Sequence, residues 1–294
     1  MELLTVFTPT YNRAHTLPRL YDSLCRQTSK DFRWLVIDDG STDNTEDLIK
    51  TYIGNSQFKI DYIKKENGGL YTGYNTAYAN IETELNVCID SDDFMPDDAV
   101  EIISTRWKEQ GGNQYAGLVG LDFLTNGKPI SGYFPPDLNE VYLFDLKSKR
   151  LHTGDSKQVM RTDLMKSVAP QIGFEGEKDF NPYYMLIKAA DTLPMIVINK
   201  NLCFVEYQES DSMSRNIYRQ YIRSPKSFAK TRELEMRLSR TTFKHKIRSA
   251  IHYVAECRLA NQSAFTHRNP CRLLTLALYP IGLALYHHIK HKSK

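Results

Sequence analysis

The chain has few cysteines, and they form none of the patterns that build a cross-linked structure. They are scattered, odd in number and without a CxxC pair: Cys25, Cys88, Cys203, Cys257 and Cys271. This spacing excludes a disulfide framework and predicts reduced thiols in a cytosolic compartment. A signal peptide is also lacking, since the first apolar run spans only residues 3–7. We therefore expect the chain to begin in its first strand.

Long hydrophobic runs are absent as well. The longest apolar segment, residues 273–286, would reach about 21 Å as a helix at ~1.5 Å per residue, whereas a bilayer core is about 30 Å thick. Pro280 and Gly282 also interrupt it. The segment is therefore predicted to lie in the membrane interface, with Lys290, Lys292 and Lys294 facing anionic headgroups. The alternative is a terminal helix packed on the rest of the chain or on a second subunit.

Acidic residues are scarce at the C-terminal end. Residues 211–294 carry 17 Lys+Arg and 4 Asp+Glu, whereas residues 1–210 carry 21 and 31. We predict two domains, an acidic one at 1–210 and a helical, basic extension at 211–294. Because the basic stretch contains no nucleic-acid-reading motif, no nucleic-acid partner is expected. Further cations are expected to add to the membrane-facing surface: Arg215, Arg219, Arg223, Lys226 and Lys230.

The first half of the chain alternates between strand-like and helix-like segments. Buried strands are predicted at 3–7, 34–37 and 85–89, and a half-exposed strand at 58–63. Amphipathic or capped helices are predicted at 17–24, 45–52, 69–81 and 97–107. This alternation predicts an α/β, Rossmann-like fold with a mostly parallel central sheet. No internal repeat or low-complexity tract is visible.

Polar loops follow three of these strands, at 8–12, 38–41 and 90–93. Ligands bind beyond the carboxyl ends of parallel strands, so the loops are expected to meet in one crevice. The loop at 90–93 places three carboxylates within four residues: Asp90, Asp92 and Asp93. Their repulsion calls for a positive partner, and a divalent cation that holds a diphosphate is the natural candidate. The alternative is a solvated loop with an Asp-rich helix cap.

Four segments carry a resemblance to a known family. They are residues 8–13 (TPTYNR), 36–43 (VIDDGSTD), 66–69 (ENGG) with Asn75 beyond, and 90–93 (DSDD). In this order, at strand ends, they resemble the family-two nucleotide-sugar glycosyltransferases with the A-type fold, of the bacterial surface-polysaccharide kind. The resemblance is close over residues 2–110 and looser over 150–208.

The resemblance implies a donor site in the first two loops. Tyr11, beside Thr8 and the Pro9 turn, would give the nucleotide base a flat surface, unless its ring serves only packing. Asp39 would accept a hydrogen bond from the base, while Asp38 holds the turn. The same loop also reads as a plain helix cap. Gly68 would let the backbone approach the donor closely, or would simply open a helix.

For the acidic loop, the resemblance implies a metal site. Asp92 would bind Mn²⁺ or Mg²⁺ directly, and Asp90 would contact the donor ribose or sugar, or the metal through water. The metal would stabilise the departing nucleotide as a Lewis acid.

Inverting transfer also needs a general base, which similar enzymes carry in an acidic loop of the second half. The corresponding segment here is 174–180 (FEGEKDF). Asp179 is favoured over Glu177, although either can instead be a charge at a helix start. Upstream, Asp155 in the segment 152–155 would shape the acceptor site or form a plain turn.

The resemblance thus implies an inverting, metal-dependent enzyme. It would move a monosaccharide from a nucleotide sugar, most simply a UDP-sugar, to a lipid-linked or growing surface polysaccharide such as a capsule or lipopolysaccharide. It would act as a peripheral protein on the cytoplasmic face of the membrane. A nucleotidyltransferase is disfavoured because residues 8–16 lack glycine, and an oxidoreductase because no GxGxxG follows the first strand. A non-catalytic glycan- or lipid-binding module remains as a rival.

Overall fold

The computed structural model describes residues 2–152, 154–206 and 217–293. Within them an eight-stranded sheet has the order β3-β2-β1-β4-β7-β5-β8-β6. Its strands are β1 (Leu4–Thr10), β2 (Phe32–Asp38), β3 (Ile60–Lys64), β4 (Leu85–Cys88), β5 (Gly117–Leu124), β6 (Glu140–Val141), β7 (Ser156–Arg161) and β8 (Met195–Val205).

Most neighbouring strands of the sheet run parallel. The strands β1 to β4 pair with one another in parallel, and β5 pairs with β8 in parallel. The exceptions are β7, antiparallel to both β4 and β5, and the short β6, antiparallel to β8. The mostly parallel α/β sheet expected from the sequence is therefore confirmed, while β6 and β7 were not predicted.

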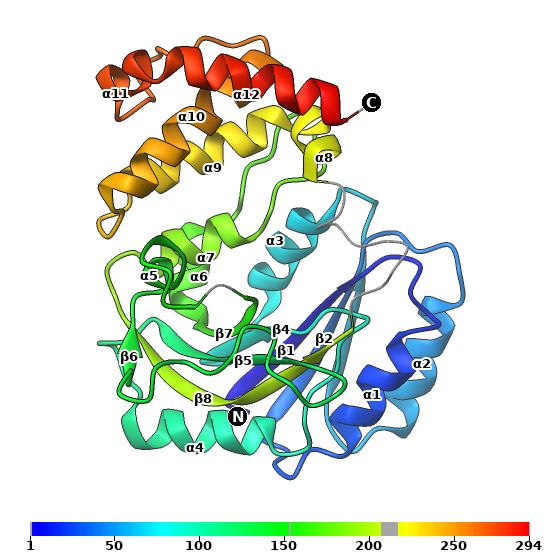
Figure 1. The fold of residues 1–294 in the computed structure, drawn as a ribbon. Coiled ribbons are helices and arrows are strands. Elements are labelled where there is room, and N and C mark those ends of the chain that lie inside the picture. Colours follow the sequence, from blue (N-terminus) through cyan, green and yellow to red (C-terminus); the bar gives the residue numbers. More distant parts are fainter. Residues whose placement is uncertain (1, 153, 207–216, 294) are drawn as a thin grey trace.

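Helices cover both faces of the sheet (Figure 1). On one face lie α1 (Leu17–Cys25), α2 (Thr45–Asn55) and α4 (Ala99–Gln110). On the other lie α3 (Leu70–Asn80), α5 (Leu143–Ser148), α6 (Thr162–Val168) and α7 (Tyr183–Ala189). Because side chains alternate along a strand, β1 sends Leu4 and Val6 into the first core and Phe7 into the second.

The described C-terminal part, residues 217–293, is helical. It contains α8 (Ile217–Arg223), α9 (Pro225–Arg237), α10 (Phe243–Leu259), α11 (Arg272–Ala277) and α12 (Tyr279–Lys292). These helices stack as a layer of their own beyond α3 and α7 (Figure 1). The predicted domain boundary between 210 and 211 lies outside the described residues, so that division stays a prediction.

The apolar run at 273–286 differs from its expected form. It is divided between α11 and α12, which meet at Leu278. Pro280 does not break a helix, because it occupies the first turn of α12, where a missing N–H costs nothing. Gly282 lies inside α12, and its N–H donates to the Leu278 carbonyl at 3.0 Å.

Gly282 brings α12 into direct contact with α10. A Cβ built on this glycine would lie 2.4 Å from Val254 Cβ and 3.0 Å from the Ile251 carbonyl oxygen. Farther along α12, Ile289 is fully buried. This packing matches the alternative of a terminal helix packed on the chain itself. No helix in the described ranges is long and apolar enough to cross a bilayer.

Replacing Gly282 tests this close approach. We expect Gly282→Ala to lower the free energy of unfolding by about 1–3 kcal/mol, because the added methyl overpacks the α10–α12 contact. Urea denaturation followed by circular dichroism measures the change.

Gly54→Ala in α2 is the matched control, since a Cβ there meets nothing within 4 Å. That variant should be neutral or more stable by up to about 1 kcal/mol, as alanine favours the helix. Equal stability of the two variants would contradict the observed packing.

Candidate functional site

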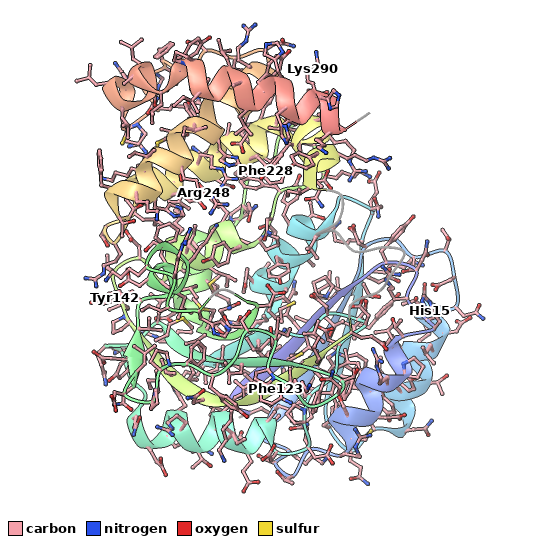
Figure 2. All side chains as sticks on the ribbon, in the orientation of Figure 1. His15, Phe123, Tyr142, Phe228, Arg248 and Lys290 are labelled. Atoms are coloured by element: carbon pink, nitrogen blue, oxygen red, sulfur yellow. The ribbon has the colours of Figure 1, made fainter. Side chains whose placement is uncertain are left out.

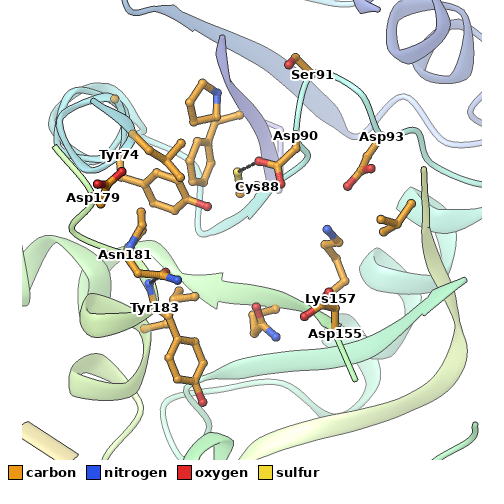
Figure 3. Close-up of a pocket in the computed structure, with 18 of the residues that line it drawn as sticks. Tyr74, Cys88, Asp90, Ser91, Asp93, Asp155, Lys157, Asp179, Asn181 and Tyr183 are labelled. Carbon is orange, nitrogen blue, oxygen red and sulfur yellow. Dashed lines mark hydrogen bonds between the residues drawn. The ribbon is translucent and has the colours of Figure 1, made fainter. Parts of the chain in front are cut away.

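One large pocket opens at the carboxyl ends of β1, β2 and β4. Its volume is about 1520 Å³, and Tyr11, Asp39, Asp90 and Asp92 line it together. The far wall comes from β7 and the 176–183 segment (Figure 3). Arg223, Ser224 and Arg248 add the helical layer to this wall. Pockets for one small molecule usually measure about 300–1,000 Å³. This pocket therefore has room for two ligands side by side.

At the end of β2, Asp38 is fully buried and does not line the pocket. Its Oδ1 accepts the Ser41 N–H at 2.7 Å, and its Oδ2 accepts the Tyr62 hydroxyl at 2.5 Å. Burial, with this bond to a carboxylate, raises the pKa of Tyr62. Asp38 therefore holds the turn, and its side chain does not reach the pocket.

Asp39 lines the pocket and accepts hydrogen bonds from the loop at residues 65–69. Its Oδ1 accepts Lys65 Nζ at 2.6 Å and the Gly68 N–H at 3.0 Å, and its Oδ2 accepts the Gly69 N–H at 2.9 Å. Gly69 has φ +91°, and a Cβ there would lie 2.9 Å from the Lys178 carbonyl oxygen. The Gly-Gly pair therefore lets this loop touch the acidic 174–180 segment.

Of the remaining residues expected to contact the donor, Pro9 and Tyr11 line the pocket. Thr8 does not: its side chain is fully buried and accepts Trp34 Nε1–H at 3.0 Å. Strand alternation explains the difference, because Thr8 points to the face of β1 opposite that of Pro9. Gly68 also lies outside the lining, and its N–H donates to Asp39.

The acidic loop after β4 faces a buried cation. Asp90, Asp92 and Asp93 all line the pocket, and Asp93 is buried in its wall. Lys157 from β7 extends toward this cluster (Figure 3), with its Nζ 3.7 Å from Asp122 Oδ1 on β5. Burial raises the pKa of Asp93 to about 8 and that of Asp122 to about 6, while the Lys157 ammonium opposes both rises.

Sequence reasoning missed Lys157. The acidic cluster did predict a positive partner, and the chain itself supplies this one. Lys157 belongs to the polar start of β7. This strand lies between β4 and β5 in the sheet, and pairs with both although they are distant in sequence. A single ammonium does not balance the carboxylates of Asp90, Asp92 and Asp122, so this end of the pocket keeps an excess of negative charge.

This excess fits a divalent cation that arrives with its ligand. No three His, Cys, Asp or Glu side chains in the described ranges form a metal-binding group by themselves. Mg²⁺ is commonly held by one or two carboxylates together with substrate phosphates, not by a complete protein cage. Asp90 and Asp92 offer such a partial set of oxygen ligands.

The geometry separates the two candidates for the general base. Glu177 is buried, does not line the pocket, and caps α9. Its Oε1 accepts the Lys226 N–H at 3.0 Å, and its Oε2 accepts the Ser227 N–H at 2.8 Å and hydroxyl at 2.7 Å. Both oxygens of the Glu177 carboxylate thus accept hydrogen bonds at the start of α9. This is the helix-start role that the sequence analysis named as the alternative to a general base.

Asp179 lines the pocket instead. Arg223 at the end of α8 donates to both of its oxygens, each at 3.1 Å, and Ser224 Oγ donates to Oδ2 at 3.2 Å. The helical layer therefore orients this carboxylate. Arg223, which was expected at a membrane surface, pairs with Asp179 at the pocket while its side chain is 66% exposed, so the membrane role stays a prediction. Arg215, expected beside it, lies outside the described residues.

The remaining wall of the pocket is rich in cations. His152, Gly154 and Asp155 line it, whereas Thr153 lies outside the described residues. Three further basic side chains line the same wall: Lys147, Arg150 and Arg248. The sequence analysis did not single these out, because they come from segments almost 100 residues apart.

Relatives with similar sequence are glycan-building proteins. The chain is 33% identical over 126 residues to the poly(ribitol-phosphate) beta-N-acetylglucosaminyltransferase TarP of Staphylococcus aureus, covering 42% of this chain and 38% of TarP. It is 35% identical over 100 residues to a hyaluronan synthase of Pasteurella multocida, covering 34% of this chain and 10% of that protein. The first four curated relatives are matched over only 10% to 38% of their own length.

Solved structures share the fold. The S. aureus TarS fragment 1-349 in complex with UDP-GlcNAc has a TM-score of 0.63 at 20% identity, over 98% of this chain and 81% of that one. The mannosyltransferase PcManGT from Pyrobaculum calidifontis, in complex with GDP-Man and Mn²⁺, has a TM-score of 0.58 at 16% identity, over 99% and 83%. At these identities the likeness concerns the fold alone.

The match to a family model covers more than half of the chain. The model described as glycosyl transferase family 2 matches residues 5–165, which run from β1 through β7 and contain the loops at 38–41 and 90–93. Together with the sheet order and the structural neighbours, this match decides the assignment. The chain belongs to glycosyl transferase family 2 and has the GT-A fold.

Proposed function

We propose that the chain transfers a monosaccharide from a nucleotide sugar, with UDP as the nucleotide, to a saccharide acceptor. The observation that carries this proposal is the convergence of Asp39, Asp90, Asp92 and Asp179 on one pocket. These carboxylates come from three separate segments: the loop after β2, the loop after β4 and the 174–180 segment. The proposal is also supported by structural neighbours that hold UDP-GlcNAc or GDP-Man.

The donor would bind at the β1–β2 side of the pocket. Tyr11 is half exposed there and offers its ring to the base. Asp39 offers Oδ1 as an acceptor for a base N–H, which would compete with Lys65 Nζ for that atom. The diphosphate would then extend toward Asp90 and Asp92, the part of the pocket that carries excess negative charge.

A divalent cation bound by Asp92, with Asp90 beside it, would supply Lewis-acid stabilisation to the leaving diphosphate. Lys157 lines the same part of the pocket and offsets part of the repulsion among these carboxylates. Asp90 and Asp92 would hold the cation, while Asp39 and Tyr11 would fix the nucleotide at the other end.

Asp179 would act as the general base. An acceptor hydroxyl oxygen forms a bond to the anomeric carbon while the bond from that carbon to the diphosphate oxygen breaks. The electron pair of the broken bond leaves with the nucleotide diphosphate, and Asp179 takes the hydroxyl proton. Attack from the side opposite the leaving group inverts the configuration. Arg223 and Ser224 keep the carboxylate pointed into the pocket.

Removing the charge at Asp92 tests the metal role. We expect Asp92→Asn to lower metal-dependent sugar transfer by about a hundredfold or more, a loss typical of removing transition-state charge stabilisation. The release of UDP from a panel of UDP-sugars with Mn²⁺ measures the effect. Asp98→Asn is the control, because Asp98 is exposed at the start of α4 and makes no side-chain cap. Full activity of Asp92→Asn would remove the metal role.

The two acidic candidates of the 174–180 segment should behave differently. We expect Asp179→Asn to lower transfer about a hundredfold or more, with UDP binding unchanged. Glu177→Gln should keep transfer within a few-fold but lower the free energy of unfolding by about 1 kcal/mol, since it weakens the α9 cap.

Initial rates and thermal denaturation of both variants separate these effects. A large loss of transfer in a stable, UDP-binding Glu177→Gln protein would reverse the assignment.

We also propose that the protein works on the inner face of the cell membrane. Leu273 and Leu276 of α11 are 84% and 60% exposed, and Arg272 lies beside them. Exposed leucines with neighbouring cations suit the interface of an anionic bilayer. Here α11, and not the whole apolar run, would make the contact, because α12 packs on α10.

Vesicle binding tests this proposal. The double variant Leu273→Glu, Leu276→Glu should bind anionic phospholipid vesicles at least about tenfold more weakly. The reason is that it loses two leucine side chains that would insert into the bilayer. Ile172→Glu is the control, since Ile172 is 74% exposed but lies between α6 and α7, outside the C-terminal helical layer. Co-sedimentation measures the bound fraction, and equal binding by both variants would contradict the role of α11.

A further inference from the structure

A second, shallower cavity of about 630 Å³ lies between α10 and α12. Its apolar lining comes from two helical stripes, with side chains three or four residues apart on each helix. The main apolar residues are Ile247 and Ile251 of α10 and Ile281, Ala284 and Leu285 of α12. We call this cavity the α10–α12 groove. These side chains are aliphatic, and Ile281 is 53% exposed to solvent.

The edge of the α10–α12 groove is cationic. Lys244 and Arg248 line it together with His252 and His288, and no acidic residue does. Across the described parts of the chain, neither Lys244 nor Arg248 makes an ion pair. The groove therefore suits a molecule with an apolar chain and an anionic group beside it.

Arg248 connects the groove to the candidate active site. It lines the groove and also the large pocket that contains Asp90, Asp92 and Asp179. Figure 2 shows it on α10. A ligand in the groove with its anionic group at Arg248 would direct whatever is attached to that group into the catalytic pocket.

The helices that form the groove are held in fixed register. Gly282 brings α12 against Val254 of α10, one turn from Ile251, and Ile289 is buried beyond it. The groove is thus a fixed depression between packed helices. A second copy of the chain is a poor occupant for the groove, because an isologous contact would bring its own cationic edges together.

We propose that the α10–α12 groove holds the hydrocarbon chain of an isoprenoid-like lipid acceptor, and that Arg248 binds its phosphate or diphosphate group. The glycan attached to that group would then extend past Asp179. This inference rests on the proposed glycosyl transfer and names the acceptor as an anionic lipid-linked saccharide.

Binding of farnesyl diphosphate to the full chain tests the proposal. Saturating UDP and Mg²⁺ are present throughout, so that the probe's diphosphate cannot occupy the donor site. Isothermal titration calorimetry compares farnesyl diphosphate with inorganic diphosphate and with farnesol. We expect farnesyl diphosphate to bind at least tenfold more tightly than either, because only this probe fills the groove and pairs with Arg248.

Two variants and a control locate the binding site. Arg248→Gln should weaken farnesyl diphosphate binding about tenfold, through loss of a charged hydrogen bond. Ile281→Gln should weaken it several-fold. Phe243→Gln should leave it unchanged, since Phe243 is exposed on the same helix but does not line the groove.

Three results would overturn the proposal. They are equal binding of inorganic diphosphate, equal binding of farnesol, and farnesyl diphosphate binding that neither variant weakens. If the chain self-associates at rising protein concentration and this releases farnesyl diphosphate, the groove binds a second copy of the chain instead. UDP release from a UDP-sugar without acceptor is measured in parallel. If that activity persists in wild type while the probe fails to bind the groove, the proposed transfer stands and only the lipid assignment falls.

Discussion

The arrangement of this protein depends on the repulsion among carboxylates that its sheet gathers at one edge. Asp90, Asp92 and Asp93 follow β4, and Asp122 comes from β5. Burial makes their charge more costly, as the raised pKa of Asp93 shows, and Lys157 offsets part of that cost. With one lysine facing several carboxylates, this end of the pocket still has more negative than positive charge. A cation-bound diphosphate would supply what is missing, which joins the fold to donor binding in one electrostatic argument.

A second constraint joins the C-terminal helices to the pocket. Glu177 caps α9, and two residues later Asp179 is bound by Arg223 and Ser224 between α8 and α9. The helical layer is therefore part of the wall that orients the proposed base. The same helical layer carries the exposed leucines of α11 and the α10–α12 groove. One group of packed helices would therefore contact both the pocket and the lipid.

The sequence predicted what local pattern and strand-end geometry control. The parallel strands, their flanking helices and the polar loops at Tyr11, Asp39 and Asp90 followed from periodicity and the order of the segments. It could not place Lys157, because β7 gains its central position through pairing with distant strands. It favoured Asp179 over Glu177, but left a helix-start role open for either residue. Only the packed position of α9 shows which carboxylate is used as a cap.

The most direct test of the central claim is the coupling between metal and nucleotide. Calorimetric titration of the wild-type protein with UDP, with and without Mn²⁺, measures it without any knowledge of the acceptor. If the acidic cluster binds a diphosphate through a divalent cation, Mn²⁺ should tighten UDP binding by at least about tenfold, equivalent to about 1.4 kcal/mol. Equal UDP affinity with and without Mn²⁺ would contradict the account.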